Sequence, residues 1–201
     1  RPCPMREGIG IDGRLDEWGE LPFAAESETF RFAAAWDEDR LCLAARIRDS
    51  QIASAKPGAL EWGKRDSFAF WLDAREEPER SANSKPWERR GQDFLYLECG
   101  LDNAGGTARF EPERWPEGAE AACARTRGGY ALEVSIPARY LDSRQGGRWS
   151  VFRLNASARD YGGRASGPAR ESDWMPRRNR PECPPGSGSF KRIEPQKIAS
   201  D

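Results

Sequence analysis

The chain has 201 residues, enough for one well-buried core, with 32 basic and 33 acidic side chains spread along its length. This balanced and dispersed charge argues against a nucleic-acid-binding surface or a membrane-surface patch, and no run approaches the ~20 apolar residues of a transmembrane helix. Histidine is absent, which excludes a Ser-His-Asp triad, a Cys-His pair and an imidazole ligand for zinc or haem.

Alternation of apolar and polar residues with a period of two dominates the chain, and it is typical of strands with one buried face. No segment is expected to form a long helix, and turn signals such as Asn103-Ala104-Gly105-Gly106 recur between the alternating runs. The sequence therefore predicts an all-β fold, a two-sheet antiparallel β-sandwich of jelly-roll type with long loops. In chain order, the expected strands are 30–36, 41–47, 68–72, 93–99, 107–111, 119–125, 130–136, 149–156 and 188–194.

Three long stretches interrupt the alternation, at 51–65, 74–92 and 159–188, and each is rich in Gly, Pro, Ser, Arg or Glu. Loops of this length in a compact domain are usually functional or mobile, so a binding site is expected there. We expect a single domain over 1–201, with an ordered core from about 9 to 194 and a tail at 195–201.

Five cysteines leave at least one thiol unpaired within the monomer. Cys42 and Cys99 lie in apolar strand-like runs and are expected to be buried as small hydrophobic residues. Cys3 and Cys183 lie in Pro-rich segments, and a disulfide between them is an open alternative that requires the two ends of the domain to meet. Cys123 is left without an assigned partner.

Five motifs, in the same order along residues 11 to 194, carry a resemblance to a known family. Together they resemble the family 9 carbohydrate-binding modules. The motifs are Ile11-Asp12-Gly13-Arg14-Leu15-Asp16-Glu17-Trp18, Ala35-Trp36-Asp37-Glu38-Asp39-Arg40-Leu41-Cys42-Leu43, Trp62-Gly63-Lys64-Arg65-Asp66-Ser67-Phe68, Gly129-Tyr130-Ala131-Leu132-Glu133-Val134-Ser135-Ile136-Pro137, and Ser172-Asp173-Trp174 with Gly188-Ser189-Phe190.

The resemblance implies a two-sheet sandwich that binds glucans, xylans or free sugars, often at the reducing end, between two tryptophans. Carried over by motif, these are Trp62 and Trp174. A pyranose has an apolar face of C–H groups that stacks on an indole, while its hydroxyls need polar partners. The expected function is therefore non-catalytic carbohydrate binding in support of polysaccharide breakdown or uptake.

Polar side chains near these tryptophans are the candidates for holding sugar hydroxyls, and they are Arg65, Asp66, Asn155 and Asp173. Asp66 has a structural alternative, because a residue at the start of a strand often braces a loop. The chain departs from the family at Ala69, where the family commonly has a Glu beside the sugar.

The other tryptophans divide by context. Trp18, Trp36 and Trp149 are expected in the core, and Trp71 lies opposite the apolar Phe68-Phe70-Leu72 face, on an outer surface or in a second layer. Trp87 and Trp115 lie in polar loops beside proline.

No cofactor is required, but a structural calcium ion is left open by the resemblance, with oxygen ligands from Asp37-Glu38-Asp39 or from Asp12 with Asp16-Glu17. The expected partners are a carbohydrate and other domains of a larger polypeptide, with no nucleic acid and no membrane insertion. The chain begins with Arg1, which indicates a mature or trimmed product, and an extracellular, periplasmic or cell-surface location is expected.

Three other functions are alternatives to carbohydrate binding. A glycosidase needs two carboxylates at a set spacing, which sequence alone does not reveal. A haem-binding sandwich would have only Met5 and Met175 as thioether ligands. The serious alternative is a non-catalytic protein-interaction module of a surface protein whose sugar slot is vestigial, because Ala69 removes a ligand-facing carboxylate.

Overall fold

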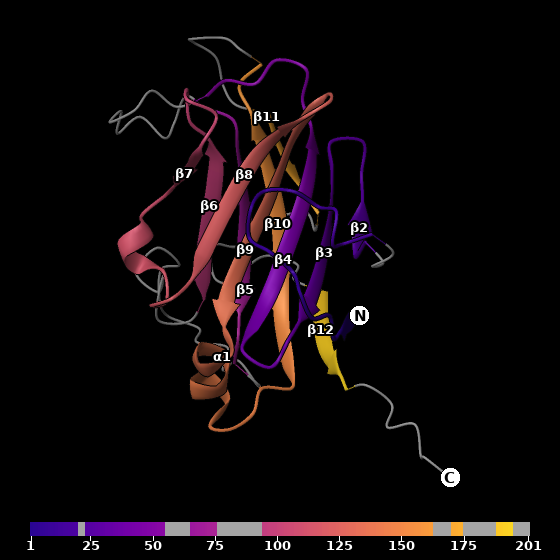
Figure 1. The fold of residues 1–201 in the computed structure, drawn as a ribbon, viewed down its shortest axis with the longest axis vertical. Coiled ribbons are helices and arrows are strands. Elements are labelled where there is room, and N and C mark those ends of the chain that lie inside the picture. Colours follow the sequence, from indigo (N-terminus) through magenta and orange to yellow (C-terminus); the bar gives the residue numbers. More distant parts are fainter. Residues whose placement is uncertain (20–22, 55–64, 76–93, 163–169, 175–187, 195–201) are drawn as a thin grey trace, which may run out of the picture.

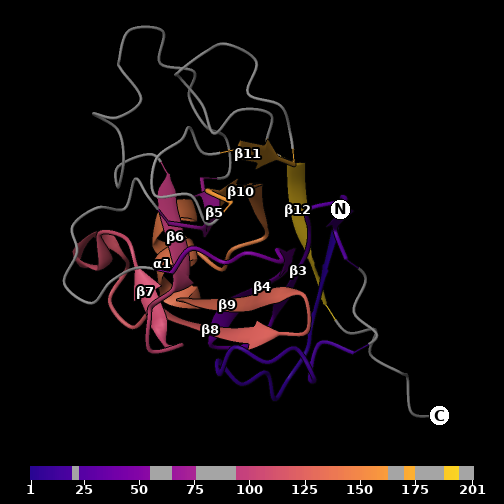
Figure 2. The ribbon, with the colours of Figure 1, turned by 90° about the horizontal axis from the view of Figure 1, so that it is seen from above.

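A computed structural model of the chain describes residues 1–19, 23–54, 65–75, 94–162, 170–174 and 188–194. Its strands form two sheets packed face to face (Figures 1 and 2). The five-stranded sheet has the order β2 (Ala25–Glu26), β3 (Phe30–Trp36), β4 (Arg40–Arg48), β9 (Gly129–Pro137) and β8 (Glu120–Thr126). The seven-stranded sheet has the order β1 (Pro2–Pro4), β12 (Gly188–Ile193), β10 (Val151–Asp160), β5 (Ser67–Asp73), β6 (Leu95–Leu101) and β7 (Thr107–Arg109), with β11 (Arg170–Asp173) also paired to β10.

The core lies between the two sheets and is made by the apolar residues of each alternating strand. Aromatic rings join the layers edge to face, with ring centroids 5.0 Å apart for Phe30 and Phe68 and 6.1 Å apart for Phe32 and Phe70. All described strand pairs are antiparallel except β1 with β12, which is parallel. The predicted two-sheet sandwich is thus confirmed, with one parallel pair added at its edge.

The predicted strands correspond to β3 to β10 and β12, and the structure adds elements that the pattern missed. A short helix, α1 (Ala138–Gln145), follows β9, and a single 3₁₀ turn spans Pro112–Arg114. α1 is too short for a helical period to be visible, since only Ala138 and Leu141 are buried. β1 shows that ordered structure begins before residue 9, whereas 195–201, the expected tail, lie outside the described residues.

The N-terminal motif lies along the outer face of the five-stranded sheet, as Figure 2 shows for the indigo segment. Ile9 and Trp18 pack on small residues of β3 and β4. Buried Glu133 in β9 anchors this segment, because its carboxylate accepts hydrogen bonds from the amides of Asp12 (3.0 Å) and Gly13 (2.8 Å) and from Trp18 Nε1 (2.7 Å). Burial raises the pKa of Glu133, and the three donors offset part of that rise.

The core tryptophans are confirmed, since Trp18, Trp36 and Trp149 are buried, and Trp115 is buried with them. Trp87 lies outside the described residues.

Cys3, Cys42, Cys99 and Cys123 are buried free thiols. Burial is confirmed for Cys42 and Cys99, and it raises the pKa of Cys42 to about 12, which keeps its thiol protonated. The Cys3–Cys183 disulfide is not formed: Cys3 is enclosed within β1 as a free thiol, and Cys183 lies outside the described residues. Among the described residues, no helix has both the length and the apolar character needed to cross a membrane.

Candidate functional site

The outer face of the seven-stranded sheet carries an unusual set of side chains for a surface that points away from the core. Since successive residues of a strand point to opposite faces, the partners of core residues in β5, β6 and β10 lie on this outer face. Backbone register aligns Glu98, Ala69, Ser157 and Asp173 in one row across β6, β5, β10 and β11. A neighbouring row holds Tyr96, Trp71 and Asn155. We call these seven residues the outer grid.

Glu98 is the electrostatic centre of the outer grid, and only 2% of it is exposed. Its carboxylate accepts hydrogen bonds from the hydroxyls of Ser67 (2.5 Å) and Tyr96 (2.7 Å) and from Arg159 Nη1 (3.3 Å). A buried carboxylate held by three donors has a fixed orientation, because turning it would leave a charge without partners. The Glu98 network therefore presents polar groups in fixed positions to a ligand that binds nearby.

An aromatic cluster adjoins this network on the same face. The half-buried ring of Trp71 lies 4.3 Å from the ring of Tyr96 and 5.6 Å from the ring of Phe94, measured between centroids. Trp71 Nε1 donates a long hydrogen bond of 3.4 Å to the hydroxyl of Ser157. Of the two positions expected for Trp71, the structure shows the outer surface. There its indole lies beside the Glu98 carboxylate and the hydroxyls of Tyr96 and Ser157.

Three of the predicted polar residues reach this face or its edge. Asn155 is buried beside Trp71, and Asp173 lies across from Ser157. Arg65, which precedes β5, is buried; burial lowers its pKa to about 10, while the nearby Glu98 charge opposes that shift. The structure therefore brings Arg65, Asn155 and Asp173 to one region, although they are far apart in the sequence.

Asp66 lies beside this region but faces two loops. Its carboxylate accepts hydrogen bonds from the amides of Ala53 (2.5 Å) and Tyr161 (2.6 Å), so it ties the segments after β4 and β10 to the start of β5. Burial raises the pKa of Asp66 to about 7, and neighbouring Asp49 adds to the rise. This is the bracing arrangement weighed for Asp66 as the alternative to sugar contact.

Trp174 does not lie on the outer grid. Its ring meets Phe32 of the opposite sheet edge to face at 4.9 Å and lies 6.1 Å from Phe190, both measured between centroids. The ring also lies against the backbone of Gly188, where a Cβ atom would clash with it. These are contacts with the core at the sandwich edge. Trp62, its predicted partner, lies outside the described residues, so a slot between the two rings stays a prediction.

Asp37, in one of the acidic stretches proposed as calcium ligands, makes other contacts. Asp37 Oδ1 accepts the amides of Asp39 (3.0 Å) and Arg40 (2.9 Å), as in a tight turn, and Asp37 Oδ2 pairs with Arg40 Nε at 3.1 Å. Within the described ranges, a different acidic group, Asp49, Asp66 and Asp160, has carboxylate oxygens within 4.8 Å of one another. Three carboxylates at this spacing suit a hard cation such as calcium.

Sequence reasoning missed Tyr96 and Glu98 as site residues. The signal was present in the expected strand 93–99, where both stand at positions that alternate with the apolar ones. Their neighbours could not be deduced, because β6 pairs with β5 across a long intervening segment.

No protein-family model matches the chain, and neither does any curated protein sequence. Solved structures, in contrast, do match the chain. A family 9 carbohydrate-binding module from Caldicellulosiruptor kristjanssonii in complex with cellotriose is 14% identical with a TM-score of 0.65, covering 100% of this chain and 98% of that one. The structure of such a module from the same organism in complex with glucose is 16% identical with a TM-score of 0.66, covering 100% of both chains. The chain therefore has the fold of the family 9 carbohydrate-binding modules.

Proposed function

We propose that the chain binds carbohydrate without cleaving it, and that the outer grid is the binding face. The observation that carries the proposal is the row of Glu98, Ala69, Ser157 and Asp173 beside the indole of Trp71. An aromatic ring next to fixed acceptors and hydroxyls is what a pyranose requires, since one of its faces is apolar and its rim is polar.

A neutral glucose-type pyranose is the first ligand to test. The similar solved structures contain cellotriose and glucose, respectively, and their fold covers this chain from end to end. Ala69 adds no polar group to the middle of the grid, and Glu98 provides a carboxylate from the adjacent strand. Trp62 remains the candidate for a second ring, whereas Trp71 takes the role first assigned to Trp174.

Of the carboxylates in the outer grid, Glu98 and Asp173 are too far apart to act as a glycosidase pair. Glu98 and Asp173 are separated by three strand spacings, about 14 Å between backbones, whereas glycosidases place their carboxyl pair roughly 5 to 9.5 Å apart.

Calorimetry with cellotriose and with glucose tests the proposal. Trp71→Ala is expected to weaken binding by about 1 to 3 kcal/mol, the usual contribution of an aromatic stacking platform. Trp149→Phe, which alters a buried tryptophan that packs on Trp36 in the core, serves as the control and should bind like the wild type. If the folded wild-type protein binds neither sugar, the alternative of a protein-interaction module with a vestigial slot replaces this proposal.

We also propose a structural calcium ion at Asp49, Asp66 and Asp160, where it would neutralise three clustered charges and join the loops that Asp66 braces. A polysaccharide-binding role is consistent with an extracellular, periplasmic or cell-surface location and with other domains in a larger polypeptide. Fractionation of the native source would test the location.

A further inference from the structure

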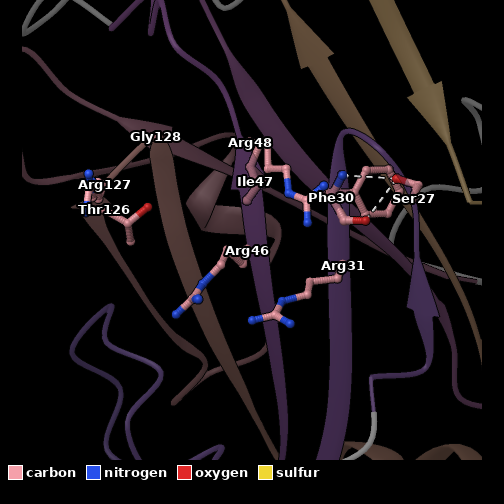
Figure 3. Close-up of a pocket in the computed structure, with 9 residues that line it drawn as sticks. All are labelled: Ser27, Phe30, Arg31, Arg46, Ile47, Arg48, Thr126, Arg127 and Gly128. Carbon is pink, nitrogen blue, oxygen red and sulfur yellow. Dashed lines mark hydrogen bonds between the residues drawn. The ribbon is translucent and has the colours of Figure 1, made fainter.

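A cavity outside the outer grid lies on the five-stranded sheet. It has a volume of about 250 Å³ and lies against the end of the five-stranded sheet where β3, β4 and the β8–β9 turn meet. Figure 3 shows Arg31 and Arg46 extending side by side from neighbouring strands, with Arg48 and Arg127 at the rim. We call these four residues the arginine pocket.

None of the described residues that line the arginine pocket is acidic. Within the part of the chain that the structure describes, none of its four guanidinium groups forms an ion pair. Arg31 only stacks on the ring of Phe23, with its guanidinium carbon 4.1 Å from the centroid. This differs from Arg40, Arg75 and Arg159, each of which has a carboxylate partner within the described residues.

Folding alone does not favour this arrangement. Arg31 and Arg46 stand directly opposite each other in the register of β3 and β4, and like charges at such positions destabilise a sheet. The residues facing Arg46 and Arg48 on β9 are Ala131 and Gly129, so the adjoining strand fills little of the space beside them. Gly129 must stay small, because a Cβ atom there would clash with the backbone of Ile47.

We propose that the arginine pocket binds an oxyanion, a carboxylate or a sulfate, carried by a sugar residue. The planar guanidinium fork matches both groups through paired hydrogen bonds, and several forks around one cavity hold a single charged group. The oxyanion is assigned from the arginine pocket alone, and only its attachment to a sugar rests on the proposed function.

The local charge disfavours an extended polyanion such as nucleic acid. Asp49 directly follows Arg48, so the row of positive charge on β4 ends at an acidic residue. Nucleic-acid surfaces instead combine a basic groove along the backbone with open aromatic rings for base stacking. Here Phe30 is 2% exposed and Phe23 lies under the guanidinium of Arg31.

Calorimetry tests the proposal with a galacturonate oligomer, a sulfated oligosaccharide, inorganic sulfate and single-stranded DNA. We expect saturable binding of at least one acidic oligosaccharide, competition by inorganic sulfate, and weakening as sodium chloride is raised. Arg46→Gln and Arg48→Gln should each reduce affinity tenfold or more, which corresponds to about 1.4 kcal/mol or more. Arg139→Gln, an exposed arginine on α1, is the matched control and should change nothing.

The experiments distinguish a failure of the arginine-pocket proposal from a failure of the proposed sugar site on the outer grid. Cellotriose affinity should be the same in Arg46→Gln and the wild type, because cellotriose carries no charge. Unchanged thermal unfolding of the two variants shows that they are folded. The proposal is overturned if no acidic oligosaccharide binds, if the folded variants bind it as well as the wild type, or if single-stranded DNA binds as tightly as the sugars.

Discussion

Replacing Trp174 by alanine decides whether this ring is part of the core or a wall of a sugar slot. A large aromatic side chain buries about 150 to 250 Å², worth about 4 to 6 kcal/mol at ~25 cal/mol per Å² when burial is complete. Trp174 is only partly buried, and its edge-to-face contact with Phe32 adds about 1 kcal/mol. We expect Trp174→Ala to lower the free energy of unfolding by about 3 kcal/mol, which is about 6 to 12 °C in Tm for a chain of this size.

Guanidinium unfolding followed by tryptophan fluorescence measures this loss, and Trp174→Phe is the matched variant because it retains an aromatic ring between Phe32 and Gly188. Trp174→Phe should recover about half of the lost stability and bind cellotriose like the wild type. A Trp174→Ala protein that unfolds at the wild-type temperature but no longer binds sugar would refute the core assignment and restore the two-tryptophan slot.

Two further predictions concern buried carboxylates. Glu133→Gln should destabilise the fold by about 2 kcal/mol, because one amide oxygen replaces two carboxylate oxygens that accept three hydrogen bonds. Amide hydrogen exchange of residues 9–18 should then become faster. Unchanged exchange would argue against the anchoring role of Glu133. In EDTA, the free energy of unfolding should fall by about 2 to 4 kcal/mol as the pH rises from about 4 to 7. The reason is that the folded chain keeps a proton on Asp66, whose pKa is raised from an ordinary 3.8 to about 7, whereas the unfolded chain releases that proton. Chemical unfolding of Asp66→Asn should show no such dependence on pH. Calcium should remove the same loss of stability at pH 7, and a Tm that does not respond to calcium would exclude the proposed ion.

Most of the sandwich could be predicted because its strands each bury one face. In β3 and β4 the alternation is regular, and the short Asp37-to-Arg40 connection between them predicts a hairpin. β11 could not be found, since Arg170–Asp173 has no apolar residue to reveal a period. β1 could not be found either, because two of its three residues are proline, which is disfavoured inside sheets.

The site was predictable only as far as the motifs carried it. Asn155 and Asp173 were named from the sequence and do lie near each other on β10 and β11. Trp174 lies off the outer grid because adjacent residues of a strand point to opposite sides: Asp173 lies on the outer row, so the next side chain along is turned toward Phe32. A motif gives spacing along the chain, but the face is determined by register, which depends on strands far apart in the sequence.

The exchange of Glu for Ala69 has a physical explanation in this register. Ala69 and Glu98 are directly opposite each other on β5 and β6, where Cβ atoms lie about 4.5 to 5.5 Å apart. Two carboxylates at these positions would repel each other on a face that excludes water from Glu98. A chain that has Glu98, with Ser67, Tyr96 and Arg159 arranged to hold it, therefore favours a small neutral residue at 69. On this argument Glu98 can supply the carboxylate that the family resemblance leads one to expect at position 69.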